Sequence, residues 1–256
     1  MNVNSTQFRV ALSLALIALA TAGAAWSPRL ELPVNSGAWG APGGISDGLA
    51  LWYDAAEVGS MQFSPRLRYW FDKSGQAQHA AVSPGTLLPY PTLATGVPGL
   101  QFTGAAVPIP ISIPIEPMTA MIVFRHSSEG LSHPLIGSRT KFVGIAMEYG
   151  RLRMYNNGIS AGASTARTVT GLTITTIRTV VGGTDSVQYN GGPETTFNFT
   201  SAESINWIGG MFVSGSTRLY FVGTMMEVVI WGRSLSPSEL ESAHRALGAK
   251  WGISVP

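Results

Sequence analysis

Residues 220–253 read YFVGTMMEVVIWGRSLSPSELESAHRALGAKWGI. The first part, residues 220–231, is almost wholly apolar and rich in Val, Ile, Tyr and Phe, which predicts a β-strand. Both faces of this strand are apolar, and a strand of that kind is covered on both sides. We therefore expect residues 220–231 to lie in the middle of a sheet.

A short helix is predicted directly after this strand. Gly232 ends the strand, and Ser236, Pro237 and Glu239 occupy the N-cap, N1 and N3 positions of a capping box. Apolar residues then follow at helical spacing, namely Leu240, Ala243, Leu247 and Trp251. This narrow apolar stripe predicts that the helix docks back on the sheets.

The composition favours one all-β domain with a large core. The chain has 256 residues, of which 45% are hydrophobic and only 12% are charged, and it contains 30 Gly and 16 Pro. The absence of Cys excludes disulfides, thiolate metal sites and cysteine nucleophiles. Because the net charge is only +2 and the Arg residues are scattered, we expect no nucleic-acid partner.

The N-terminal region predicts export or anchoring. Residues 10–26 are uncharged and apolar, follow a polar and basic start, and end in small residues, which is typical of a signal peptide. The alternatives are an uncleaved membrane anchor and a helix that packs on a partner, so residues 1–26 are assigned to one of these three roles. Residues 27–46, with four Gly and three Pro, predict a linker, and the domain is expected to span residues 47–256.

The middle of the chain predicts many short antiparallel strands. Residues 118–125 read as an inner strand, whereas residues 107–115 alternate with Pro and read as an edge strand. Asn156-Asn157-Gly158 and Asn190-Gly191-Gly192 predict hairpin turns. Short strands at regular spacing favour an antiparallel β-sandwich, and no repeat suggests a propeller.

Seven stretches carry a family pattern, in this order: GLALWYDA (48–55), WFDKSGQAQHA (70–80), GLQF (99–102), MTAMIVF (118–124), VQYNGG (187–192), INWIGG (205–210) and VGTMMEVVIWGRSLSPSELESAHRALGAKWGI (222–253). Together they resemble the laminin-G-like members of the concanavalin A-like lectin/glucanase superfamily, in its bacterial and phage branch. The resemblance covers residues 47–253. It implies a jelly roll of two antiparallel sheets, and glycan binding, adhesion or structural display more often than catalysis.

The acidic residues argue against an enzyme. A glycosidase of this fold needs two carboxylates that flank the scissile bond, placed at alternate positions of one strand. No Asp lies two residues from a Glu, and the nearest pair is Asp54 and Glu57. Glu227 interrupts the apolar strand, and we expect it to be held by an Arg or by backbone donors, or to face solvent, rather than to act in catalysis.

Metal ligands are few in the sequence. Asp72, with Ser74 and Gly75, offers oxygens of the kind that calcium prefers, but a turn-forming role explains this Asp better. His126 and His133 flank a polar loop, where we expect them to be solvated rather than to bind a metal. We therefore predict no cofactor and no metal site, with calcium as the one alternative.

Glycan binding requires an exposed aromatic side chain for the sugar ring and amide or carboxylate groups for its hydroxyls. The candidate aromatic residues lie beside predicted loops, with polar candidates near them: Trp70, Tyr90 and Tyr155, and Asp72, Asn156 and Asn157.

The sequence predicts an exported, non-enzymatic, lectin-like protein that binds a glycan or another surface polymer outside the cell or at its surface. The alternative is a structural or assembly component of a virion or cell surface, which contacts a membrane or neighbouring subunits through residues 10–26. A polysaccharide hydrolase or lyase is a third, weaker interpretation. Homo-oligomerisation is left open.

Overall fold

The structure is a computed structural model that describes residues 40–64, 66–82, 89–94, 96–126, 133–156, 159–161, 171–199, 201–215 and 217–256. They all belong to the second of two compact units of the chain, Ala38–Pro256. Within these described ranges no helix is long and apolar enough to cross a membrane. The helix predicted within residues 1–26 lies outside them.

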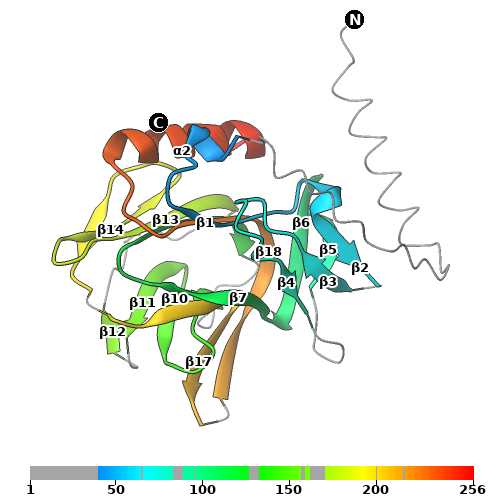
Figure 1. The fold of residues 1–256 in the computed structure, drawn as a ribbon, viewed down its shortest axis with the longest axis horizontal. Coiled ribbons are helices and arrows are strands. Elements are labelled where there is room, and N and C mark those ends of the chain that lie inside the picture. The colour runs from blue at the N-terminus through cyan, green and yellow to red at the C-terminus, as the bar shows by residue number, and fades with distance from the viewer. Residues whose placement is uncertain are drawn as a thin grey trace, which may run out of the picture. The chain divides into compact units, whose positions relative to one another are not determined.

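The larger sheet has nine antiparallel strands (Figure 1). They are β1 (Leu49–Asp54), β5 (Tyr90–Ala94), β6 (Val97–Ala105), β8 (Met118–His126), β13 (Leu172–Thr179), β14 (Asp185–Tyr189), β15 (Thr195–Phe197), β17 (Gly210–Ser214) and β18 (Thr217–Trp231). The order along the sheet is β15-β14-β13-β8-β18-β6-β5, and β1 and β17 also pair with β18.

A six-stranded sheet packs against the larger one. It consists of β7 (Val107–Pro114), β9 (His133–Gly137), β10 (Val143–Glu148), β11 (Arg151–Asn156), β12 (Ile159–Ala161) and β16 (Ser204–Ile208), in the order β12-β11-β10-β9-β16-β7. Apolar side chains of both sheets fill one buried core, so the predicted antiparallel β-sandwich is confirmed.

The remaining elements are short, except for the C-terminal helix α2 (Pro237–Trp251). A three-stranded sheet is formed by β2 (Met61–Phe63), β3 (Leu67–Trp70) and β4 (Ala80–Ala81), and the two 3-10 turns are η1 (Pro42–Gly44) and η2 (Val58–Ser60).

Strand β18 lies at the centre of the larger sheet, as predicted for residues 220–231. It pairs with β8 along one edge and with β6 and then β1 along the other. Its side chains enter two apolar clusters: Phe221, Met225, Val228 and Ile230 join the core between the sheets, and Met226, Val229 and Trp231 join a cluster that includes α2. Both faces are therefore covered, which explains why the strand is apolar throughout.

Helix α2 begins and ends as the sequence predicts. The Ser236 side chain accepts a hydrogen bond from the Glu239 backbone N–H, and the Glu239 side chain accepts one from the Ser236 backbone in return. Gly252 adopts a left-handed conformation with φ of 68° and ends the helix. Its buried face contacts the side of the larger sheet opposite the main core (Figure 1).

The predicted linker contains residues that belong to the domain. Ala41 and Ile45 are buried in the cluster under α2, and the Trp231 indole N–H donates a hydrogen bond to the Ile45 carbonyl at 2.9 Å. Gly43 lies so close to α2 that a Cβ there would be 2.7 Å from the Ala243 backbone nitrogen. The Gly and Pro residues of this stretch thus serve close packing, so the predicted domain start at Asp47 was too late.

The other local predictions can be compared with the sheets. β8 lies between β13 and β18, and β7 forms an edge of the smaller sheet, which confirms both assignments. Asn190 and Gly191 have φ of 51° and 70°, so the second predicted hairpin turn is confirmed. The turn at Asn157 lies outside the described residues.

Candidate functional site

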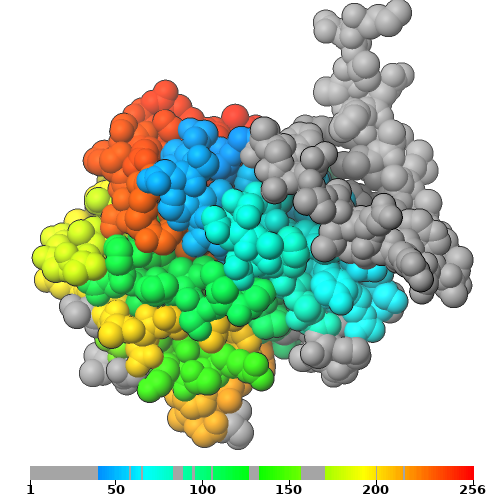
Figure 2. All heavy atoms as spheres, in the orientation of Figure 1, coloured from blue at the N-terminus to red at the C-terminus, as the bar shows by residue number. Residues whose placement is uncertain are grey.

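An aromatic face lies on the three-stranded sheet. We define it as Tyr69 of β3 and Phe71, which follows β3. Tyr69 is 42% exposed, and the two rings are parallel within 3° with centroids 6.1 Å apart. The part of the chain that contains β2, β3 and β4 is coloured cyan in Figure 2, where it forms a continuous region of the visible surface. A flat, accessible ring of this kind can receive the apolar face of a planar or cyclic ligand.

The strand alternation sets which rings face outward. Tyr69 lies opposite Gln62 of β2 and Ala81 of β4. Trp70 points the other way, has no exposed surface and stacks on Tyr53 at 5.0 Å. The aromatic face therefore rests on a packed core layer, which holds it in place.

The loop after the aromatic face is organised by Asp72. One carboxylate oxygen accepts hydrogen bonds from the backbone N–H groups of Trp52 and Ser74, both at 2.9 Å. The other accepts from the Ser74 hydroxyl at 2.6 Å and from the Gln78 backbone N–H at 3.0 Å. His79 accepts the Asp72 backbone N–H and meets the edge of the Phe71 ring at 5.4 Å. The loop thus holds the Phe71 ring in place through His79.

A charge cluster with two buried carboxylates lies next to this loop. We define it as Asp54, Glu57, Lys73, Glu227 and Lys250. The Lys73 ammonium contacts Asp54 at 2.8 Å and Glu57 at 2.5 Å, and the Lys250 ammonium contacts Asp54 at 2.8 Å and Glu227 at 2.7 Å. The cluster therefore links β1, the Asp72 loop, β18 and the end of α2.

Glu227 has no exposed surface and is held from three sides. Besides Lys250, the indole N–H groups of Trp52 and Trp251 each donate a hydrogen bond to it at 2.6 Å. Glu227 does not face solvent, and its donors are Lys and Trp side chains instead of the Arg or backbone groups expected from the sequence.

The two buried carboxylates of the cluster differ in their acidity. Burial opposes ionisation of Asp54, but Lys250 and Lys73 outweigh it and hold the pKa of Asp54 below its usual value. Burial and the neighbouring Asp54 charge raise the pKa of Glu227, which has only one ammonium partner. Asp54 contacts two ammonium groups and Glu227 contacts one, which explains why their pKa values shift in opposite directions.

Three of the residues predicted to bind a ligand lie in this part of the molecule. Trp70 is completely buried, so it cannot stack on a ligand, and this candidate is corrected. Asp72 has both oxygens satisfied, so the alternative of calcium at this residue does not fit, because calcium needs several free oxygen ligands. Tyr90 is half-buried, and the guanidinium of Arg66 lies 4.7 Å from its ring centroid.

The other three candidates belong to β11 and the turn after it. Tyr155 is only 8% exposed, stacks on Phe142 at 5.1 Å and donates a hydrogen bond to Glu148 at 3.0 Å. Asn156 is half-buried and accepts a hydrogen bond from the Ser201 hydroxyl at 3.4 Å. Asn157 lies outside the described residues. Strand β11 belongs to the smaller sheet, so the five described candidates do not form one site.

Tyr69 and Phe71 were missed although the signal was present. In a strand, alternate residues share a face, so the tripeptide Tyr69-Trp70-Phe71 places its first and third rings together and the second opposite. Trp70 was chosen because it lies beside a predicted loop, but the strand period determines which ring is exposed.

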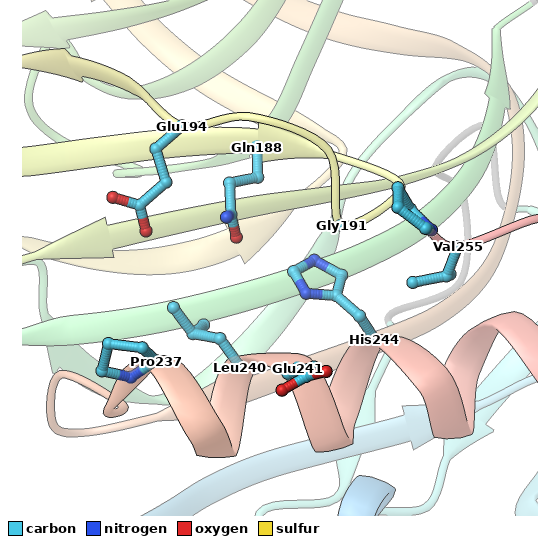
Figure 3. Close-up of a pocket in the computed structure, with 9 residues that line it drawn as sticks. Gln188, Gly191, Glu194, Pro237, Leu240, Glu241, His244 and Val255 are labelled. Atoms are coloured by element: carbon cyan, nitrogen blue, oxygen red, sulfur yellow. The ribbon is translucent and has the colours of Figure 1, made fainter.

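Two hollows flank the turn at Gly191. The hollow shown in Figure 3 has a volume of about 110 Å³ and is lined by Gln188, Gly191, Glu194, Pro237, Leu240, Glu241, His244, Val255 and Pro256. Ligand pockets usually measure about 300–1,000 Å³. His244 is buried and hydrogen-bonded to Thr176 at 2.7 Å, and Glu194 pairs with Arg178 at 3.3 Å. The small volume and the engaged side chains make this hollow a poor ligand site.

The second hollow is larger, but its lining offers few groups that could bind a ligand. It has a volume of about 470 Å³ and is lined by Leu172, Tyr189, Asn190, Gly192, Gly252, Ile253, Ser254 and Pro256. None of these lining residues is charged. The Tyr189 hydroxyl accepts the Leu152 N–H at 2.9 Å, and Asn190 accepts the Ile174 N–H at 2.8 Å. The aromatic face therefore remains the best candidate site among the described residues.

His133 is buried rather than solvated, which corrects the expectation for that residue, whereas His126 is half-buried. His133 is only 6% exposed, and the two rings contact each other with centroids 4.6 Å apart. Within the described residues there is no group of three or more His, Cys, Asp or Glu side chains that could hold a metal ion.

No family model matches the chain, and no curated protein sequence matches it. Solved structures do. A sialidase of Trypanosoma rangeli in complex with sialic acid has a TM-score of 0.51 at 18% identity, over 79% of this chain and 33% of the sialidase. Domain 4 of AbnA, a GH43 extracellular arabinanase from Geobacillus stearothermophilus, solved in complex with arabinotriose, has a TM-score of 0.53 at 12% identity, over 77% of this chain and 98% of that domain.

The binding domain of Paraclostridial Mosquitocidal Protein 1 is a third similar structure, with a TM-score of 0.50 at 13% identity, over 79% of this chain and 53% of that one. The likeness is one of fold. The chain spans about a third of the length of the sialidase, 33%. At these identities the comparisons show a likeness of fold and leave the ligand to be argued from this chain's own residues.

Proposed function

We propose that this protein is a glycan-binding protein that holds a sugar chain against the aromatic face and does not cleave it. The observation that carries the proposal is Tyr69, which is 42% exposed and parallel to Phe71 within 3°. A pyranose or furanose ring has one face lined by C–H groups, and burial of that face against an aromatic ring is favourable.

The surroundings of the aromatic face suit this role. Its backing is rigid, because Trp70 is packed on Tyr53 and both oxygens of the Asp72 carboxylate accept hydrogen bonds. A rigid platform lowers the cost of ordering side chains when a ligand binds. A glycan-binding surface of this type needs no deep cavity, because the sugar ring rests on the aromatic side chains from outside.

The similar structures support the same ligand class. One was solved with sialic acid, another with arabinotriose, and the third is described as a binding domain. The order of motifs along residues 47–253 supports a finer assignment to the laminin-G-like branch of the concanavalin A-like superfamily.

The acidic residues support binding without cleavage. Hydrolysis of a glycosidic bond needs two carboxyl groups that both reach the sugar, about 5–10 Å apart. Glu227 exposes no surface, and Asp54 and Glu57 are engaged by Lys73. A raised pKa such as that of Glu227 is found in catalytic acids, but here burial causes it without giving access to a substrate.

Export to the cell surface or extracellular space is part of the proposal and is supported by the signal-like residues 10–26 and by the low charge of 12%. A screen of the full-length chain against an array of neutral and acidic polysaccharides tests the ligand class. We expect saturable binding to at least one polysaccharide, and uniform failure to bind would contradict the proposal.

The second candidate function is assembly into a virion or cell surface layer. It is favoured by residues 10–26, which are apolar along their whole length and suit contact with a membrane or a neighbouring subunit. N-terminal sequencing of the mature protein separates the two: cleavage near Ala24 supports export, whereas a retained Met1 supports assembly through this segment.

A further inference from the structure

Two histidines from neighbouring strand ends form a contact that the glycan-binding proposal does not use. His126 ends β8 in the larger sheet, and His133 begins β9 in the smaller sheet. Their ring centroids are 4.6 Å apart and the ring planes are inclined by 67°. We refer to these two residues as the histidine pair.

One ring of the histidine pair is held in place by the backbone. His133 is hydrogen-bonded to the backbone of Tyr220. Histidine ligands usually make such a bond with one nitrogen, which fixes the ring and aims the other nitrogen at the metal. The Nε2 atom of His126 is buried and has no hydrogen-bond partner among the described residues. A buried polar atom of this kind requires a partner.

We propose that His126 and His133 together bind one divalent transition-metal ion of the zinc, nickel or copper type. Two imidazoles that bind one tetrahedral ion at about 2.0–2.1 Å have ring centroids on the order of 5 Å apart, close to the spacing seen here. Imidazole nitrogen favours these ions over calcium and magnesium, which prefer oxygen. Water completes the coordination, because His126 is only half-buried.

Isothermal titration calorimetry of the full-length chain without a polyhistidine tag tests the proposal. We expect zinc and nickel chlorides to bind saturably at neutral pH with one ion per chain, and calcium and magnesium chlorides to give no saturable binding. His126→Gln and His133→Gln should each weaken zinc binding at least tenfold. His79→Gln is the matched control, because it removes a histidine that contacts Phe71 instead, and it should leave zinc binding unchanged.

The proposal is overturned if the wild-type chain binds neither zinc, nickel nor copper, if calcium binds as well as zinc, or if His126→Gln retains wild-type zinc affinity. If a variant does not fold, the imidazole NMR signals of the wild-type chain decide instead. Zinc should shift the signals of His126 and His133 and leave those of His79 in place, and the reverse pattern contradicts the proposal.

Discussion

Replacing the buried Glu227 by Gln tests the role assigned to the charge cluster. The carboxylate accepts hydrogen bonds from Trp52 on one oxygen, and from Lys250 and Trp251 on the other. Gln has nearly the same shape but only one acceptor oxygen and an NH₂ group in place of the second. Whichever way the amide is turned, a donor faces a donor.

The expected loss follows from these contacts. If the amide oxygen stays beside Lys250 and Trp251, the amide NH₂ meets the Trp52 indole N–H, and an unsatisfied buried donor costs about 1–3 kcal/mol. Lys250 loses one partner but keeps Asp54 at 2.8 Å. Removal of one member of a buried ion pair costs about 3–5 kcal/mol when the other is left alone. Because Lys250 is not left alone, we expect Glu227→Gln to destabilise the fold by about 2–4 kcal/mol.

Urea unfolding followed by tryptophan fluorescence measures this difference. The matched control is Glu241→Gln on the exposed side of α2, where the carboxylate pairs only with Arg245 and is 60% exposed. An exposed pair of this kind contributes less than about 0.5 kcal/mol. A free energy of unfolding for Glu227→Gln within about 0.5 kcal/mol of wild type would refute the reasoning.

Three further predictions concern packing, pH and the helix start. Gly137→Ala should destabilise the fold by about 2–3 kcal/mol, because its Cβ would lie 2.6 Å from the Gly210 carbonyl oxygen, whereas Gly232→Ala, with no atom nearer than 3.9 Å, should be nearly neutral in urea unfolding. Lowering the pH from 6.5 to about 4 should reduce stability through His126, because its native pKa of about 4 lies below the unfolded value and the unfolded chain binds more protons in that window. Thermal melts should show a shallower pH dependence for His126→Asn, and parallel profiles would count against this. Ser236→Ala should cost about 1 kcal/mol by removing the N-cap, and an unchanged melting temperature would contradict the capping assignment.

Most of the fold could be predicted because its signals are local. Residues 220–231 are apolar on both faces, so a central strand was the only position that buries them, and the capping box at Ser236 fixed where the helix begins. The domain start was harder to predict. Residues 40–46 are rich in Gly and Pro and lack a periodic pattern. Their place in the domain depends on the hydrogen bond between Ile45 and Trp231, which are 186 positions apart in the chain.

The site was predicted only in part, because exposure depends on which way a strand faces. The sequence drew attention to residues 70–80, and the aromatic face does lie beside them. Trp70 was chosen for its place beside a predicted loop, but pairing with β2 and β4 turns it inward and leaves Tyr69 outside. The contact between His126 and His133 could not be predicted either, since it depends on how the two sheets meet.

The central claim, that the aromatic face binds glycan, is tested most directly by calorimetric titration of two tyrosine variants with the polysaccharide that the array selects. Tyr69→Ala removes the exposed ring of the aromatic face, and Tyr149→Ala removes a more accessible ring elsewhere, 62% exposed. We predict that Tyr69→Ala weakens binding at least tenfold, which corresponds to about 1.4 kcal/mol, with an unchanged melting temperature, while Tyr149→Ala binds as the wild type does. Wild-type affinity in Tyr69→Ala would contradict the account.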